Sequence, residues 1–561
     1  MPFPFERISA APVPEDARQY MVRMRDGVRL ATDVYLPASD EGAGTVPAVL
    51  VRLPYDKNSR YVYLDRVARL FTARGYAVVV QDVRGKFRSG GSTVPFLREP
   101  QDGYDTLEWI VHQPWSDGRV GMFGDSYYGF TQWAAVAAQH PALRAIVPRV
   151  TAADFNTIWQ PEGQRAPVWL EGVEYFAHHW VDNESYEYAI DRSRRPVIEQ
   201  YEEAFRAIGA RSLWFDLLAP RQAGLSTQPG LHPFDARPVP VLHCVGWFDN
   251  IVSAHMRDYM ELASRPGWDA VQYLWAGAVD HENYRLAQAP VSAENDHNTD
   301  EGALDRMLPD YANPAIEFFD VFLKEVRPLS SLSKVSWELG HSGWRTSTKW
   351  PPPDSTERTF WLADAVRASS PLPGGSLSDH PVDEGATVRW THDPDDPVPS
   401  AVDDSFAYLR VHPDLSLMVG REDVLAFSGP VLSEPLDLAG PVVVGLHVTS
   451  TAEVFDVFAR VVDLAPDGQA RLVARGQISV HASEAADEIR VELGHTGYRL
   501  RPGHRLTLVL ASSDHPLFLP APGTGENPWT ALTAKPSVQT LHVGGVRPSH
   551  LTVTVVPPAA P

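Results

Sequence analysis

Cysteine is nearly absent from this sequence, since Cys244 is the only one among 561 residues. A single thiol excludes a disulfide framework and a metal site built from cysteines. No apolar run is long enough to span a membrane. Residues Met1 to Arg7 lack the basic start and apolar core of a secretory signal. The sequence therefore predicts a cytoplasmic protein.

The sequence also lacks an excess of positive charge. It contains 49 Lys and Arg residues against 71 Asp and Glu residues, a formal net charge of −22. The acidic residues are spread along the chain rather than gathered in blocks, so the surface should repel polyanions. We therefore expect neither nucleic acid nor a membrane as a partner.

The first 150 residues alternate between apolar strands and amphipathic helices. A hairpin around the turn Asp26-Gly27 comes first, and helices are expected at 64–74 and 102–112. Such alternation is typical of a parallel sheet covered by helices. The buried strands expected here are 48–53, 76–82, 119–123 and 145–148.

Residues 151–238 differ in pattern from the residues before them. Trp169, Phe176 and Trp180 fall at helical spacing, a second helix is expected at 197–208, and strand signals are absent. We therefore predict a helical cap inserted into the sheet domain. The core, residues 1–150, resumes over 239–334 with strands at 239–247 and 271–275 and a last helix at 314–324.

The last part, residues 335–561, consists of short alternating apolar runs separated by clusters of Pro, Gly and Asp. The first of these runs is 335–339. The pattern predicts an all-β sandwich of jelly-roll type, whose length suits a single domain.

The most informative stretch is Gly124-Asp125-Ser126-Tyr127-Tyr128-Gly129, with an apolar strand before it and an Ala-rich helix after it. A serine at the tip of a tight strand-to-helix turn is typical of the nucleophile of an α/β-hydrolase fold. The alternative is an ordinary loop in which Ser126 is the N-cap of the helix.

The other two residues of a catalytic triad should follow in the order Asp, then His, each just after a strand. Asp249 follows the strand at 239–247, and His281 follows the strand at 271–275. Asp280 is an alternative acid, although sequence neighbours rarely orient each other's side chains. His255 is an alternative base, but we expect it on the surface of a helix.

An oxyanion formed at Ser126 needs hydrogen-bond donors. The backbone N–H of Tyr127, directly after the serine, is one candidate. The hydroxyl of Tyr55, in the loop after the strand at 48–53, is a second; the alternative is that Tyr55 only packs at the end of this strand.

Several motifs together resemble a family of serine hydrolases that includes cocaine esterase, α-amino-acid ester hydrolases, glutaryl-cephalosporin acylases and X-Pro dipeptidyl-peptidases. The matching segments are 52–57, 81–86 with 89–91, 121–129, 246–249, 344–352, 393–399 and 458–468. The resemblance implies that Ser126 is the nucleophile, Asp249 the acid and His281 the base, with Tyr55 and the Tyr127 N–H as the oxyanion hole. It covers nearly the whole chain.

The chain departs from the family pattern before the base. The family usually has Gly-Pro-Trp-x-His, whereas this chain has Gly277-Ala278-Val279-Asp280-His281. The loss of Pro and Trp alters the loop and part of the pocket wall.

We also expect Asp82 and Arg84 to form a buried structural pair.

Substrate-binding residues are harder to predict. Trp159, Trp169 and Phe176 are candidates for an apolar acyl pocket, although aromatic residues at helical spacing more often pack in a core. An amine-selecting enzyme would need carboxylates near the pocket, and Glu171, Glu174 and Asp182 are available.

Taken together, these residues predict a serine esterase that needs neither metal nor cofactor and acts on a small-molecule ester or amide. The sequence leaves open whether it forms a homo-oligomer. Two alternatives remain: an X-Pro dipeptidyl-peptidase or β-lactam side-chain acylase, and a carbohydrate-binding β-sandwich protein with an inert hydrolase core.

Overall fold

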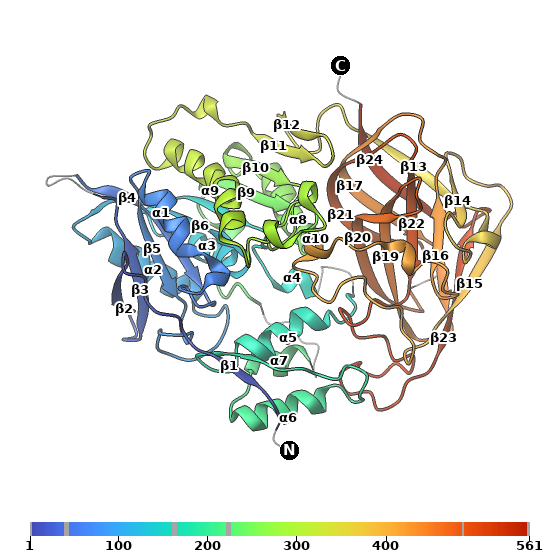
Figure 1. Cartoon of the computed structure of the whole chain (residues 1–561), viewed down its shortest axis with the longest axis horizontal. Helices are drawn as coiled ribbons and strands as arrows, with labels where there is room; N and C mark the ends of the chain where they lie inside the picture. The colour runs from blue at the N-terminus through green and yellow to red at the C-terminus, as the bar shows by residue number, and fades with distance from the viewer. Residues whose placement is uncertain (1–2, 39–43, 160–164, 220–225, 485–486, 558–561) are drawn as a thin grey trace.

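The computed structural model describes residues 3–38, 44–159, 165–219, 226–484 and 487–557. Three parts can be distinguished in Figure 1: a sheet covered by helices, a group of short helices below it, and a β domain beside both. Among the described residues, no helix combines the length and the apolar character needed to cross a membrane.

The first part contains a ten-stranded sheet in the order β12-β11-β10-β9-β7-β6-β4-β5-β3-β2. Neighbouring strands from β5 to β11 are parallel, and the outer strands β2, β3 and β12 are antiparallel to their neighbours. The strands are β2 (Arg18–Arg23), β3 (Arg29–Tyr35), β4 (Val46–Leu53), β5 (Ala77–Asp82), β6 (Ser116–Asp125), β7 (Leu143–Arg149), β9 (Val241–Gly246), β10 (Gln272–Gly277), β11 (Val335–Leu339) and β12 (Gly343–Ser347).

Helices cover both faces of this sheet. On one face α1 (Leu64–Thr72) and α9 (Glu301–Phe322) pack against strand residues such as Val49 and Val78. On the other face α2 (Glu99–Val111), α3 (Ser126–Ala138) and α8 (Val252–Ser264) pack against residues such as Leu50 and Val79. Successive strand residues thus point to opposite, equally buried faces, as expected for a parallel sheet.

Two elements of the large sheet domain, α9 and β11, differ from the sequence prediction. Helix α9 begins thirteen residues before the expected start at 314 and runs through Pro309 and Pro314. Its N-terminus is capped by Asp300, whose carboxylate accepts a hydrogen bond from the N–H of Ala303 at 2.7 Å. Strand β11, expected in the β domain, instead pairs with β10 in the large sheet.

The described residues of the helical segment 151–238 lie below the sheet in Figure 1. One short strand within it, β8, pairs with β1 near the N-terminus, whereas the sequence predicted no strand here. The elements are α4 (Asn156–Trp159), α5 (Leu170–His179), β8 (Ser185–Glu187), α6 (Ile198–Ile208) and α7 (Leu213–Leu218), with β1 at Glu6–Ile8. Trp180, Trp214 and Phe215 are buried in its core.

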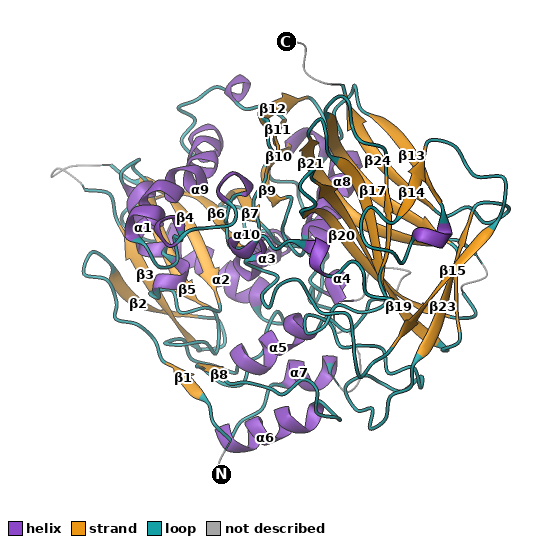
Figure 2. Ribbon diagram, turned by 45° about the vertical axis from the view of Figure 1, so that its right-hand side comes forward, coloured by secondary structure: helices purple, strands orange, loops and turns teal. Residues whose placement is uncertain are grey.

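The C-terminal β domain contains a nine-stranded sheet in the order β20-β19-β22-β16-β14-β13-β24-β17-β21 and a three-stranded sheet in the order β15-β23-β18. Figure 2 shows β15 and β23 side by side. Its elements are β13 (Thr356–Ala363), β14 (Gly375–Ser378), β15 (Ala386–His392), α10 (Tyr408–Val411), β16 (Leu425–Ser428), β17 (Leu436–Leu446), β18 (Val448–Ser450), β19 (Val454–Leu464), β20 (Ala470–His481), β21 (Ile489–Leu500), β22 (Arg505–Ala511), β23 (Ser537–Val543) and β24 (His550–Val556).

Single turns of 3₁₀ helix connect many of these elements. They are η1 (Arg60–Val62), η2 (Pro233–Asp235), η3 (Asp269–Val271), η4 (Leu286–Gln288), η5 (Ala293–Asn295), η6 (Leu329–Ser331), η7 (Ala365–Arg367) and η8 (Leu415–Leu417).

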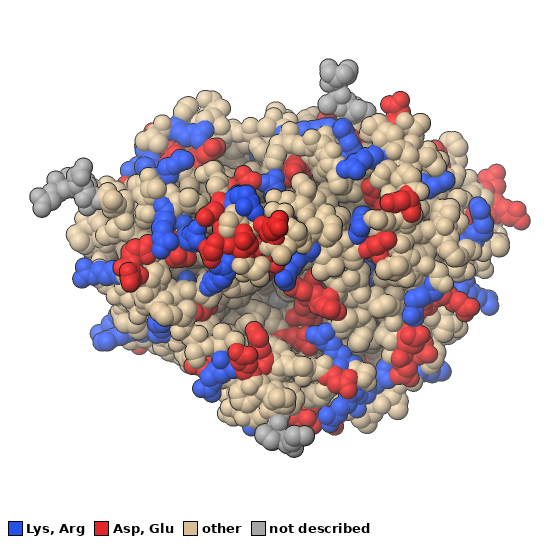
Figure 3. All heavy atoms as spheres, viewed as in Figure 1, with Lys and Arg blue, Asp and Glu red and all other residues tan. Residues whose placement is uncertain are grey.

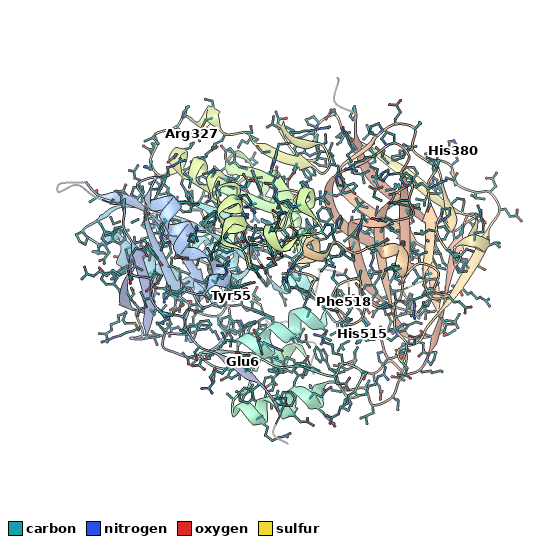
Figure 4. All side chains as sticks on the ribbon, in the orientation of Figure 1. Glu6, Tyr55, Arg327, His380, His515 and Phe518 are labelled. Carbon is teal, nitrogen blue, oxygen red and sulfur yellow. The ribbon has the colours of Figure 1, made fainter. Side chains whose placement is uncertain are left out.

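The β domain contacts both other parts. The N–H of Leu170 donates to the carbonyl oxygen of Leu517 at 2.9 Å, joining α5 to the loop after β22. Figure 4 labels Phe518 and His515 of this loop, on the side of the β domain that faces the helical segment. Trp247, just after β9, stacks on Trp350 at 5.0 Å between ring centroids. The three parts therefore meet near the ends of β9 and β10.

Candidate active site

Ser126 lies between β6 and α3 in a left-handed backbone conformation, with φ = 52°. Such a conformation is strained for a residue other than glycine and is expected at a nucleophile turn. Two glycines make room for it. A Cβ atom on Gly124 would lie 2.0 Å from the ring of Tyr128, and one on Gly129 would lie 2.6 Å from Thr151.

Asp249 and His281 are in direct contact. His281 Nδ1 donates to Asp249 Oδ1 at 2.8 Å, and both side chains are buried, with exposed fractions of 6% for His281 and 2% for Asp249. Asp249 follows β9 and His281 follows β10, two neighbouring parallel strands whose C-terminal ends lie at one edge of the sheet. Because Nδ1 carries the hydrogen, Nε2 is left free to accept a proton.

The charge of Asp249 changes the basicity of His281. Burial lowers the pKa of His281, whereas the charge and hydrogen bond of Asp249 raise it, and the resulting pKa is about 9. The imidazole is therefore a stronger base than a free histidine.

The alternative acid, Asp280, does not contact His281 in this way. Its oxygens accept hydrogen bonds from the backbone N–H groups of Leu409 at 2.8 Å and Tyr284 at 2.9 Å. Burial raises the pKa of Asp280 well above its usual value. Its carboxyl group thus fastens the loop that carries His281 to the start of α10.

The alternative base, His255, is buried rather than on a helix surface, so that expectation was wrong. Its Nδ1 accepts from the N–H of Thr151 at 3.4 Å, and its Nε2 lies 3.2 Å from His243 Nδ1. His243 Nε2 in turn lies 2.6 Å from Gln272 Oε1. These contacts assign one hydrogen to each ring and engage both nitrogens of both histidines.

Tyr127 is held firmly in the first turn of α3. Its hydroxyl donates to Glu99 Oε1 at 3.1 Å and accepts from the N–H of Phe96 at 2.7 Å. Glu99 is itself paired with Arg52 at 2.8 Å. The backbone N–H of Tyr127 is among the first N–H groups of a helix, which have no acceptor within the helix.

Tyr55 follows β4 and lies beside Ser126. Burial raises the pKa of Tyr55 to about 12, and the neighbouring hydroxyls of Ser126 and Tyr175 act in the opposite direction. Its ring makes edge-to-face contacts with Tyr61, Tyr128 and Tyr175 at 6.0 to 6.3 Å. Figure 4 shows Tyr55 between the sheet domain and α5. Its hydroxyl remains protonated at neutral pH and can donate a hydrogen bond.

Ser126, His281 and Tyr55 share one cavity of about 450 Å³, part of which is open to solvent. Its other walls are almost entirely apolar or aromatic. They are formed by Phe96, Tyr127, Phe155, Ile158, Trp169, Gly172, Tyr175, Phe176, Ile251 and Phe406. A cavity with such a lining suits an apolar group.

Trp169 and Phe176, two of the three expected substrate-binding residues, line this cavity. The side chain of Trp159 lies outside the part of the chain that the structure describes. Phe406 was missed, because it comes from the β domain and its sequence context carries no signal for a role in the pocket.

The three candidate amine-binding carboxylates are engaged elsewhere. Glu174 pairs with Arg192 at 2.7 Å, and Asp182 accepts from the hydroxyl of Tyr186 at 2.6 Å. Glu171 accepts from the N–H of Ser405 at 2.8 Å.

Asp82 and Arg84 do not form the expected pair. Asp82 binds Lys57 at 2.8 Å, and Arg84 binds Asp102 at 2.6 Å. Each side chain points to a different neighbour, because the backbone turns directly after β5.

The parallel sheet, the strained serine between strand and helix, and the buried carboxylate–imidazole pair define the class of this protein: it is a serine hydrolase with an α/β-hydrolase core. Comparison with known proteins agrees. The model of the X-Pro dipeptidyl-peptidase (S15) family matches residues 26–283, and that of the X-Pro dipeptidyl-peptidase C-terminal non-catalytic domain matches residues 330–552.

Cocaine esterase of Rhodococcus sp. (strain MB1 Bresler) is 30% identical over 595 residues, covering 96% of this chain and 98% of that protein. The solved structure of an α-amino acid ester hydrolase superposes with a TM-score of 0.78 at 23% identity, covering 97% and 98% of the two chains. That of an aminopeptidase from a marine sediment Thaumarchaeota archaeon gives 0.77 at 23% identity, covering 98% and 99%. The chain belongs to the serine hydrolase family of cocaine esterase and the X-Pro dipeptidyl-peptidases.

Proposed function

We propose that this protein hydrolyses carboxylic esters with an apolar acyl group, using Ser126, His281 and Asp249 as a catalytic triad. The observation that carries the proposal is that Ser126 and His281 line the same apolar cavity, while Asp249 holds the far side of the imidazole at 2.8 Å. This is the relationship of nucleophile, base and orienting acid that acyl transfer requires.

In the first step His281 Nε2 takes the proton of Ser126, and Oγ attacks the acyl carbonyl. Asp249 keeps the hydrogen on Nδ1 and stabilises the imidazolium that forms. The imidazolium then protonates the leaving alcohol, which leaves an acyl group on Ser126. Water, deprotonated by His281, releases the acid and restores the serine.

The tetrahedral intermediates carry a negative oxygen. We assign its stabilisation to the hydroxyl of Tyr55 and the backbone N–H of Tyr127. Tyr55 is supported by its place beside Ser126 and by a pKa that burial raises to about 12, which keeps the phenol protonated. The anchoring of the Tyr127 hydroxyl between Glu99 and Phe96 supports a fixed position for its N–H.

The lining of the cavity favours a substrate whose acyl group is uncharged. Among its described lining residues none is acidic, and Glu171, Glu174 and Asp182 are each bound to other groups. An acyl group with a free ammonium would lose its water there without gaining a counter-charge. The net charge of −22 is consistent with a small-molecule substrate rather than a polyanion.

We further propose that the helical segment 151–238 acts as a cap over Ser126 and that the C-terminal β domain is a jelly roll. Trp169 and Phe176 of the cap line the cavity. Figure 3 shows acidic and basic side chains interspersed on the face that includes the helical segment.

A second candidate, cleavage of an X-Pro dipeptide, is favoured by the family model that matches residues 26–283. The two can be separated by comparing p-nitrophenyl butyrate with Ala-Pro-p-nitroanilide. We expect the ester to be the better substrate by kcat/KM, and a higher value for the anilide would overturn the ester assignment.

The role of Ser126 is tested by the variant Ser126→Ala. We expect kcat to fall by a factor on the order of 10⁴ or more with the thermal midpoint retained. The exposed Ser331 provides a matched control, and Ser331→Ala should keep full activity. Labelling with a fluorophosphonate should modify Ser126 alone. Unchanged turnover in Ser126→Ala, or no adduct on Ser126, would contradict the proposal and favour an inert hydrolase core.

A further inference from the structure

Ser405 of the β domain lies where all three parts of the chain meet. It belongs to the loop 393–407 between β15 and α10, which is called the Ser405 loop below, and it is 3% exposed. All of its polar groups have partners. Its hydroxyl accepts from Asn250 Nδ2 at 3.0 Å, and its carbonyl oxygen accepts from Arg475 at 3.4 Å.

Both donors of Ser405, its N–H and its hydroxyl, bind Glu171 of the helical segment. The N–H of Ser405 donates to Glu171 Oε1 at 2.8 Å, and its hydroxyl donates to Oε2. Glu171 Oε2 also accepts from Trp169 Nε1 at 3.2 Å. One carboxylate therefore joins a wall residue of the cavity, Trp169, to the Ser405 loop.

The residue after Ser405 reaches the base itself. The ring of Phe406 lies edge-to-face with His281 at 4.9 Å and near the ring of Trp169 at 5.8 Å, and it lines the cavity. Its carbonyl oxygen accepts from the N–H of Glu282 at 3.3 Å. The position of Phe406 thus affects both the pocket wall and the loop that carries His281.

We propose that Glu171 is a positioning residue that sets acyl-group selectivity, by holding the Ser405 loop so that Phe406 and Trp169 close the cavity beside His281. This inference rests on the proposed esterase function and deepens it. A carboxylate that accepts three hydrogen bonds within one junction fixes the relative placement of the groups that donate them.

Burial raises the pKa of Glu171 to about 7, and the donors from Ser405 and Trp169 act in the opposite direction. Replacement by Gln keeps one acceptor oxygen and the shape of the side chain, but it cannot accept all three hydrogen bonds with the same strength. Glu171→Gln therefore weakens the hydrogen bonds that join Trp169 to the Ser405 loop, while the side chain still fills the same space.

Glu174 provides a matched control on the same helix. It is buried, binds Arg192 and Tyr201, and is not part of the cavity wall. If Glu171 only stabilised the fold, Glu171→Gln and Glu174→Gln would behave alike.

The experiment compares kcat/KM for p-nitrophenyl benzoate and p-nitrophenyl acetate in the full-length protein. We expect Glu171→Gln to lower the benzoate-to-acetate ratio about tenfold, because a loosened apolar wall discriminates less well between acyl groups. Glu174→Gln should leave the ratio within about twofold, even if its thermal midpoint falls. Ser405→Ala should shift the ratio in the same direction as Glu171→Gln.

The double variant Glu171→Gln/Ser405→Ala should lower the benzoate-to-acetate ratio little more than the larger of the two single changes, because both substitutions disrupt the same contact between Glu171 and Ser405. An unchanged ratio in Glu171→Gln, or an equal shift in Glu174→Gln, overturns the proposal. If Glu171→Gln does not fold, Ser405→Ala decides by the same criterion.

If the protein hydrolyses neither ester while Ser126 still reacts with a phosphonofluoridate, acyl-group selectivity is measured as the rate at which Ser126 is labelled by a methyl phosphonofluoridate compared with a phenyl phosphonofluoridate. The ratio of these rates then replaces the ester ratio. Failure of Ser126 to react at all rejects the proposed function and this inference together, whereas reaction with an unchanged ratio rejects this inference alone.

Discussion

Asp249 and His281 form a buried pair in which the carboxylate oxygen lies 2.8 Å from Nδ1, and in the proposed mechanism this contact determines the pH at which His281 can act as a base. Burial lowers the pKa of His281, the charge of Asp249 raises it, and the resulting pKa is about 9. Below that pH the imidazole is mostly protonated in the free enzyme and cannot take the proton of Ser126.

We therefore expect kcat/KM for p-nitrophenyl butyrate to rise about tenfold per pH unit below the pKa and to level off near pH 9. In Asp249→Asn the carboxylate is gone, so the rising limb should move to lower pH while the plateau falls on the order of 10⁴-fold. The measurement is a rate profile from about pH 6 to 10, with Ser126→Ala as the blank. A wild-type profile that is flat above pH 6 would contradict the raised pKa.

The hydroxyl of Tyr55 should act mainly on the transition state. Tyr55→Phe keeps the ring contacts with Tyr128 and Tyr175 but removes the donor, so kcat should fall on the order of 10²-fold with little change in KM. The control is Tyr61→Phe, since the Tyr61 ring also contacts Tyr55 while its hydroxyl binds Glu282. Tyr61→Phe should stay within about threefold of wild type. Equal losses in the two variants would assign the effect to packing.

The turn at Ser126 depends on Gly124, where φ is +145° and a Cβ would lie 2.0 Å from the ring of Tyr128. Gly124→Ala should therefore lower the free energy of unfolding by about 4 kcal/mol or more. Gly118, on the same strand, also has positive φ but open space around it. Gly118→Ala should cost about 1 to 2 kcal/mol, the backbone strain alone. Chemical denaturation of both variants measures the difference, and similar losses would show that the contact with Tyr128 is unimportant.

The buried pair His243 and His255 predicts sensitivity to acid. Burial lowers the pKa of His243 to about 4 and that of His255 well below its usual value. The unfolded chain, with pKa values near 6.5, binds protons that the folded state excludes, so stability is fully present above pH 6.5 and is lost as the pH falls toward 4. His243 alone should contribute a loss of about 2 kcal/mol between pH 7.5 and 5.

This slope can be measured by urea unfolding at several pH values. His243→Asn should flatten it, whereas substitution of the exposed His380, at the outer side of the β domain in Figure 4, should leave it unchanged. Identical slopes in wild type and His243→Asn would remove this pair as a source of acid sensitivity.

Much of the sheet domain could be predicted from sequence, because its signals are local. The strands around Leu50 and Val79 are short apolar runs buried on both faces, and helix α1 stops close to Gly75. The extent of α9 could not be predicted in this way. Prolines usually end a helix, and only the tertiary packing of residues such as Ile316 and the cap at Asp300 show that it continues through two of them.

The same distinction between local and tertiary signals applies to the residues of the candidate site. Ser126, Asp249 and His281 each follow a strand, so the order of the chain is enough to place all three at one edge of the sheet. Phe406 and the binding of Asp280 to Leu409 depend on how the β domain docks, and neither leaves a periodic or motif signal. His255 was expected on a helix surface because it lies in the helix after Asp249, and only the folded structure shows its contacts with Thr151 and His243.

The order of strands in the β domain has a consequence for synthesis of the protein. Strand β24, the last strand of the described chain, lies inside the nine-stranded sheet, between β13 and β17. The nine-stranded sheet therefore cannot close until the ribosome has synthesised β24 (His550–Val556). A nascent chain that already carries Ser126, Asp249 and His281 should thus lack the finished β domain, which supplies Phe406 to the cavity, until β24 has been made.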